Sequence, residues 1–291
     1  MKKILLCALV FTLAAGAAVA APLGLRVYTD GVSFGNVAAE GYKFAGDGGL
    51  ARIPLGLEFS KALGPVRFST ALEYALSFTA TPANTGDPKH QPQWNLSGSY
   101  GLQLAEASKL SFSLYNKLHF DASKGGEFAD NIWDDIGPGV RFDQTFGFGS
   151  LYAVTELSVR IYTYENADGS DKGLGLETGE NSGFQAGVNT NFGLYGYVRP
   201  YLVFLSNGES PDDMLTKFDI RVGYRTGPID ARATFTIPAV DFDATGLTIQ
   251  PRFTYNFLPT LSAYADLKIG AIGKKDADVA ITPQIGVSFS F

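Results

Sequence analysis

The chain has 291 residues, with 23 Lys and Arg against 29 Asp and Glu, and a formal net charge of −6 at pH 7. This acidic balance speaks against a nucleic-acid partner, and a single cysteine allows no intramolecular disulfide. The chain is rich in Phe, Tyr and Gly, with 22, 14 and 34 of them, and its charged fraction is only 18%.

The first 20 residues predict a secretory signal peptide. Lys2 and Lys3 form a basic start, residues 4–19 an apolar core, and residues 18–20 a small-x-small cleavage site. Residues 21–291 are the expected mature chain, with a formal charge of −8, because the removed part holds two lysines and no acid. Beyond residue 20, no apolar run approaches the roughly 18 residues that a membrane helix needs.

The mature chain alternates apolar and polar residues with a period of two, which is the pattern of β-strands with two unlike faces. The apolar face is expected to meet lipid and the polar face to line a lumen. About fourteen strands are predicted, and twelve if one or two weak strands are misassigned. They lie near 23–30, 52–59, 66–78, 94–104, 110–120, 136–143, 151–162, 184–192, 197–204, 218–225, 229–237, 247–257, 261–269 and 278–291.

The segments between these strands alternate between short and long. Short turns are expected near 61–64, 105–109, 146–149, 193–194, 226–228 and 257–260, and longer loops near 35–48, 80–92, 121–133, 164–180, 206–216, 239–245 and 272–277. Short periplasmic turns and longer outer loops are typical of outer-membrane barrels. No linker interrupts the pattern, so we predict one all-β domain over residues 21–291.

The last strand has the cleanest alternation, with Ile285, Val287, Phe289 and Phe291 on one face. This ending resembles the C-terminal assembly signal of bacterial outer-membrane β-barrels, which the barrel-assembly machinery binds. In size, strand number and ending, the mature chain is similar to the monomeric fourteen-stranded porins of the OmpG type. The resemblance implies a monomer in the outer membrane that lets ions, sugars and other small hydrophilic solutes diffuse passively, without a cofactor. A secreted β-sandwich or β-helix is the soluble alternative.

The predicted lumen face carries roughly 13 cations against 8 carboxylates. The excess of acidic residues is expected in the outer loops, at Asp168, Asp171, Glu177, Glu180, Glu209, Asp212 and Asp213. A charged wall is predicted where Arg221, Arg225, Arg232 and Arg252 interleave with Asp219 and Asp230 on three successive strands. These arginines either attract anionic solutes or pair with the acids and brace the barrel. Further lumen candidates are Arg199, Lys268, Tyr197 and Tyr201; the tyrosines either stack on sugars or fill volume.

No catalytic or metal site is predicted. His119 could combine with Ser111 or Ser113 only on the lumen face, whereas a lipid-cleaving site must meet the bilayer. A transporter for apolar ligands is disfavoured because residues 21–23 leave no room for a plug before the first strand. The remaining alternative is a barrel that transports nothing and acts through its acidic outer loops as an adhesin or structural protein, with a lumen closed by Arg–acid ladders and tyrosines.

Overall fold

The computed structural model describes residues 24–38, 41–44, 50–81, 84–85, 89–121, 131–165, 172–206, 214–239, 241–275 and 279–291. The predicted signal peptide lies outside these residues. In the described part, no helix is both long and apolar enough to cross a membrane. The helix that the described residues contain is the short α2 (Phe242–Thr245), which is capped by the side chain of Asp241.

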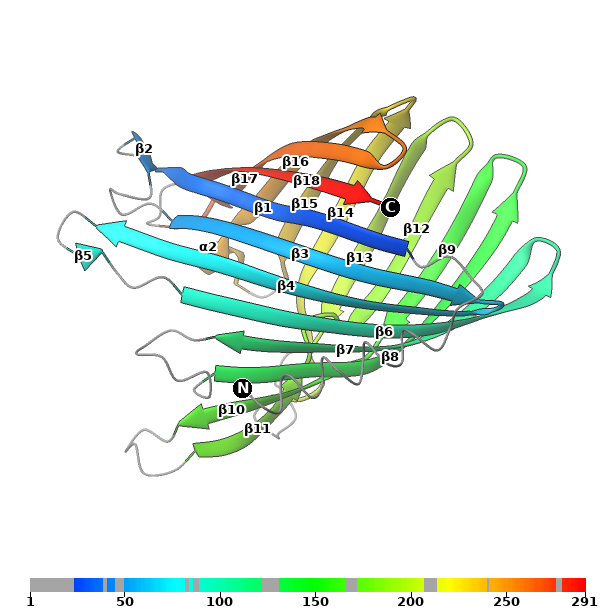
Figure 1. Ribbon diagram of the computed structural model, residues 1–291, viewed down its shortest axis with the longest axis horizontal. Helices are drawn as coiled ribbons and strands as arrows, with labels where there is room; N and C mark the ends of the chain where they lie inside the picture. The colour runs from blue at the N-terminus through cyan, green and yellow to red at the C-terminus, as the bar shows by residue number, and fades with distance from the viewer. Residues whose placement is uncertain are drawn as a thin grey trace.

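Antiparallel strands make up nearly all of the described chain (Figure 1). Those of the first half are β1 (Gly24–Ala38), β2 (Gly41–Phe44), β3 (Leu50–Leu63), β4 (Val66–Thr81), β5 (Asn84–Thr85), β6 (Lys89–Ala105), β7 (Ser108–Asp121), β8 (Asn131–Phe146), β9 (Gly149–Glu156) and β10 (Val159–Glu165). Those of the second half are β11 (Lys172–Thr178), β12 (Gly183–Thr190), β13 (Leu194–Leu202), β14 (Leu215–Thr226), β15 (Ile229–Pro238), β16 (Leu247–Leu258), β17 (Leu261–Ile272) and β18 (Ala280–Ser290).

The sheet closes into a barrel of fourteen spans, which confirms the predicted fold class and strand number. Closure is made by β1 and β18, which lie side by side in Figure 1, with Val27 opposite Phe289. Beyond β18, the amide of Phe291 donates a hydrogen bond of 2.8 Å to the carbonyl of Leu25. The predicted terminal strand is therefore the element that joins the two ends of the sheet.

Two spans are interrupted and account for four of the labelled strands. β9 and β10 follow one another along the same neighbour, β8, and β11 and β12 run beside them. At the breaks, the buried Ser158 and Ser182 bond to each other, with the Ser158 amide donating to Ser182 Oγ at 2.9 Å. We call this place, residues 157–158 and 179–182, the wall break.

Loop prediction was wrong for parts of several segments. The end of β1 and all of β2 lie within the expected loop 35–48, β5 and the start of β6 lie within 80–92, and the largest error concerns 164–180. Residues 164–180 are expected as a long loop, but β11 occupies Lys172–Thr178 and pairs with β10 from Thr178 opposite Val159 to Lys172 opposite Glu165. The charged residues around β11 obscure a short alternation in which Leu174 and Leu176 lie on one face and Gly175 lies on the other. β6 also starts earlier than expected, at Lys89.

Most expected short turns are present, and they gather at one end of the barrel, which we call the short-turn end; the opposite end is the long-loop end. Gly64 and Gly227 occupy such turns with φ of 60° and 52°, in the left-handed region that favours glycine. Glycines at these positions therefore favour tight β-turns at the short-turn end.

Candidate functional site

The closed sheet sorts side chains by parity, so the polar face of each strand lies inside the barrel. On β16, Phe253 and Phe257 remain 49% and 58% exposed on the outer face, while Arg252 lies on the other face and is ion-paired to Asp266 of β17. The terminal residues Val287, Phe289 and Phe291 are likewise exposed by 46%, 37% and 69% on the outer face. The candidate site is therefore the lumen that the polar faces enclose.

Tyrosine rings cover part of the inner wall, each against a glycine of the next strand. Tyr28 lies so close to Gly56 that a Cβ there would be 2.2 Å from the ring. The same arrangement joins Tyr152 to Gly187, Tyr162 to Gly175, Tyr195 to Gly223 and Tyr264 to Gly286.

Guanidinium groups lie over several of these rings from within the barrel. Arg252 Cζ is 3.8 Å from the ring centroid of Tyr264, and Arg141 Cζ is 4.3 Å from that of Tyr152. Arg221 lies over Tyr197 and Arg199 over Tyr201 in the same way. Cation–π contacts of this kind are worth about 0.5–1 kcal/mol when exposed. These tyrosines are therefore engaged by protein groups and offer few free faces to a sugar.

Most lumen arginines are compensated by a carboxylate. Five such pairs lie along the wall, namely Arg26–Glu58, Arg52–Glu73, Arg141–Asp143, Arg199–Glu156 and Arg252–Asp266, with the last at 2.6 Å. Of the predicted charged wall, Arg225 bonds Asp230 at 2.8 Å. Asp219 accepts hydrogen bonds from Tyr201 at 2.8 Å and from Thr236 at 2.6 Å. This part of the wall braces the barrel.

Arg221 and Arg232 are different, because neither has a carboxylate partner among the described residues. Arg221 donates from Nε to Thr234 Oγ1 at 3.0 Å. Arg232 on β15 lies directly opposite Arg252 on β16. On its other side, Arg232 lies opposite Gly223 of β14, so Arg221, two residues before Gly223, is its diagonal neighbour. We call these two residues the uncompensated pair. Like charges facing one another across strands are destabilising, so this part of the wall is best relieved by an anion or by water.

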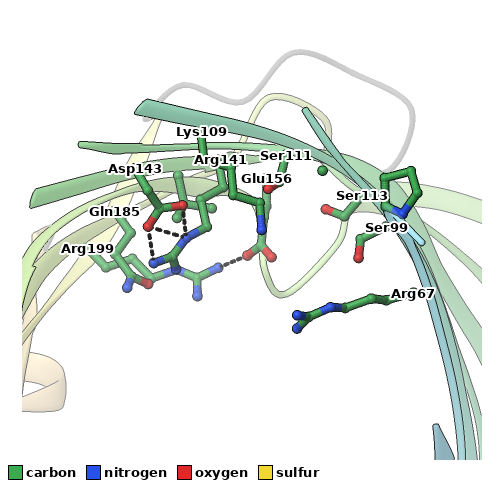
Figure 2. A pocket seen from close by; sticks show the side chains of 13 residues that line it. Arg67, Ser99, Lys109, Ser111, Ser113, Arg141, Asp143, Glu156, Gln185 and Arg199 are labelled. Atoms are coloured by element: carbon green, nitrogen blue, oxygen red, sulfur yellow. Dashed lines mark hydrogen bonds and ion pairs between the residues drawn. The ribbon is translucent and has the colours of Figure 1, made fainter. Parts of the chain in front are cut away.

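A cavity of about 660 Å³ opens on the opposite wall, towards the short-turn end (Figure 2). It has a floor of small hydroxyl side chains, Ser99, Ser111 and Ser113, on β6 and β7. Figure 2 shows Arg67 extending into this space from the wall, while the Arg141–Asp143 and Arg199–Glu156 pairs lie across from it. We call the cavity the serine pocket.

Charge is most tightly paired at the wall break. Asp135 is fully buried, and both of its carboxylate oxygens accept hydrogen bonds from Arg160. Arg160 Nε donates to Oδ1 at 2.7 Å, and Nη2 donates to Oδ2 at 3.0 Å. Arg160 also contacts Glu177 at 3.5 Å and Glu180 at 3.0 Å, and Lys117 reaches Glu180 at 3.1 Å. We call Asp135, Arg160, Glu177, Glu180 and Lys117 the ion-pair cluster.

The ion-pair cluster corrects the prediction for two loop acids. Glu177 and Glu180 are expected in an outer loop, but Glu177 lies within β11 and Glu180 in the turn between β11 and β12, and both contact Arg160 of the barrel wall. The other predicted loop acids, Asp168, Asp171, Glu209, Asp212 and Asp213, lie outside the described residues. The structure also adds Asp135 and Lys109 to the lumen side, and these two charges cancel. Because Glu177 and Glu180 join the wall, the surplus of cations there is smaller than the sequence count.

The remaining candidates lie apart from the uncompensated pair. Lys268 is exposed on β17, opposite Thr282 of β18, and no carboxylate of the described residues contacts it. His119 stacks on Trp133 with ring centroids 4.6 Å apart, whereas Ser111 and Ser113 line the serine pocket.

Comparison with known proteins bears on the fold. No protein-family model matches the chain, and no curated protein matches it in sequence. The solved structure of the CymD monoaromatic hydrocarbon channel is 12% identical, with a TM-score of 0.52 over 92% of this chain and 88% of that one. The P. putida toluene transporter TodX is 11% identical, with a TM-score of 0.43 over 92% and 88%. The KdgM porin is 9% identical, with a TM-score of 0.40 over 92% and 99%.

At this level of identity, the similarity to CymD concerns the backbone architecture alone. It agrees with the closed fourteen-span antiparallel barrel and with the resemblance that the sequence predicts. The fold of this chain is that of the outer-membrane β-barrel channels and porins.

Proposed function

We propose that the protein is an outer-membrane channel for the passive diffusion of small hydrophilic solutes, with a preference for anions. The observation that carries the proposal is the uncompensated pair, Arg221 and Arg232, on the inner wall. Arginine remains protonated at any physiological pH. Two fixed positive charges that no described carboxylate neutralises raise the local concentration of anions in a narrow passage.

The outer surface supports placement in a membrane. Large apolar side chains are exposed on strands around the barrel, for example Leu55 at 59%, Leu114 at 56% and Phe184 at 53%. A soluble protein rarely exposes so much contiguous apolar surface, whereas a membrane barrel requires an apolar outer band. The fold similarity to CymD, which is described as a hydrocarbon channel, agrees with a transport role.

The rival proposal is a barrel whose lumen conducts nothing and whose loops bind a partner. The dense Arg–Tyr contacts and ion pairs of the inner wall favour it, because they fill space and brace the strands. The serine pocket favours the channel, since about 660 Å³ of space remains along the wall.

Conductance separates the two proposals. Mature protein, refolded in detergent and shown to be folded by its heat-modifiable gel mobility, is inserted into planar bilayers, and vesicles containing it are tested for swelling in a neutral monosaccharide. We expect stepwise conductance and swelling. A folded barrel that gives neither in repeated insertions would exclude the channel.

A further inference from the structure

The serine pocket contains polar groups that no other described residue satisfies. Among the described residues, the hydroxyl groups of Ser99, Ser111 and Ser113 have no hydrogen-bond partner, although other lumen serines do. Ser69 and Ser97, for example, bond to each other at 2.7 Å. The strand pairing puts Ser99 directly opposite Ser113, so two of the free hydroxyls are neighbours.

Two cations at this floor also lack a carboxylate in the described part of the chain. Arg67 of β4 lies opposite Ser99 of β6. Lys109 of β7 crosses over Gly101 of β6, so closely that a Cβ there would be 2.8 Å from Lys109 Cε. The amide of Gly101 donates a hydrogen bond of 2.9 Å to the carbonyl of Pro65, which directly precedes β4. Since Lys109 lies over Gly101, its side chain extends towards β4, the strand that holds Arg67.

The charge of the pocket follows from these pairings. Its lining contains four cations, Arg67, Lys109, Arg141 and Arg199, and two carboxylates, Asp143 and Glu156. The carboxylates are engaged by Arg141 at 2.6 Å and by Arg199 at 2.7 Å. Two positive charges therefore remain, beside three free hydroxyl donors.

We propose that the serine pocket is a binding site for a tetrahedral oxyanion of charge near −2, namely inorganic phosphate or the phosphate group of a small monoester. A phosphate monoester carries about −1.5 to −2 charges at pH 7 and three acceptor oxygens, which match two cations and a row of hydroxyl donors. Arg67 binds the anion through its planar fork and Lys109 as a point charge, and the serines donate to the remaining oxygens. The pocket has the volume of an ordinary small-ligand site, for which about 300–1,000 Å³ is typical. The proposal deepens the channel proposal, because it requires a lumen that solutes can enter.

The test is equilibrium binding to the full mature chain folded in detergent, followed by the broadening of the ³¹P signal of inorganic phosphate. We expect saturable broadening that Arg67→Gln and Lys109→Gln each weaken about tenfold, the loss of one charge-assisted hydrogen bond. Lys268→Gln is the matched control for Lys109→Gln, because it removes the same charge from another strand, β17, at a place apart from both the serine pocket and the uncompensated pair, and it should leave the affinity within about twofold. Glycerol phosphate as competitor shows whether the monoester enters, and acetate as competitor should be weak.

Broadening that does not saturate, or that Lys268→Gln weakens as much as Lys109→Gln does, would overturn the site. Heat-modifiable gel mobility shows that each variant is folded. The binding assay needs no ion flow, so the two proposals fail separately. A folded protein that conducts but does not bind phosphate contradicts this site alone, whereas one that binds phosphate but never conducts contradicts the channel.

Discussion

The ion-pair cluster and the uncompensated pair use the same residue type in opposite ways. At the wall break, Arg160 is surrounded by Asp135, Glu177 and Glu180. On β14 and β15, Arg221 and Arg232 contact no carboxylate of the described residues, and Arg232 faces a further arginine. The difference shows that the electrostatic potential in the lumen depends on how many arginines lack a carboxylate partner, and not on how many arginines line the lumen.

Removal of the Asp135 carboxylate should have the largest effect. Asp135→Ala leaves a half-buried guanidinium without its bidentate partner, and breaking a buried ion pair costs about 3–5 kcal/mol of stability. We expect a loss near 3 kcal/mol, because Arg160 keeps Glu177 and Glu180. Guanidinium unfolding of detergent-folded protein, followed by tryptophan fluorescence, measures the change.

An exposed ion pair provides the matched control. Arg26 and Glu58 have side chains 45% and 29% exposed, and pairs of this kind contribute about 0–1 kcal/mol. Glu58→Gln should therefore lower the free energy of unfolding by less than about 1 kcal/mol. Equal losses in the two variants would show that the ion-pair cluster is not a special brace.

Disruption of a Tyr–Gly contact should cause the next largest loss of stability. In Gly56→Ala, the added Cβ would lie 2.2 Å from Tyr28 Cζ, so the ring and the Arg26 guanidinium over it must move. Overpacking of this kind costs about 1–3 kcal/mol in unfolding free energy.

Gly147→Ala is the control for the tyrosine contact, because nothing lies within 4 Å of its added Cβ. Its effect should stay within about 0.5 kcal/mol. If both glycine variants unfold at the same denaturant concentration, tight contact between Tyr28 and Gly56 does not contribute to stability.

The uncompensated pair can be converted into a compensated one. Thr234→Asp places a carboxylate opposite Arg221, whose Nε already bonds Thr234 Oγ1 at 3.0 Å. Anion preference should fall, whereas stability should change by no more than about 1 kcal/mol, the worth of a partly exposed pair. Thr234→Asn, which adds the same bulk without charge, should keep the anion preference of the native protein; an equal fall in both variants would assign the effect to volume.

Much of this contrast lies beyond what the sequence alone can predict. The period of two places Arg221 and Arg232 on the lumen face, because alternation along one strand fixes the face without knowledge of its neighbours. Which carboxylate an arginine binds depends on the strand register and on the side-chain rotamers. Arg141, for example, binds Asp143 on its own strand, and the assignment of residues to the two faces does not predict this contact.

The ion-pair cluster was missed for a related reason. It forms where two interrupted spans meet, and β11 carries only a short Gly–Leu alternation as its signal. Asp135 could have been found by extending the β8 alternation two residues upstream of Gly137. That no described carboxylate pairs with Arg221 or Arg232 could be recognised only after the strands were paired.

The most direct test of the surplus positive charge is the zero-current potential across a planar bilayer that separates two KCl concentrations. The native protein should give a potential of the sign set by chloride, and the Arg221→Gln/Arg232→Gln double variant should move it towards zero, while Arg225→Gln, whose charge is already paired with Asp230, should move it less. A potential of the sign set by potassium, or one that the double variant leaves unchanged, would contradict the account.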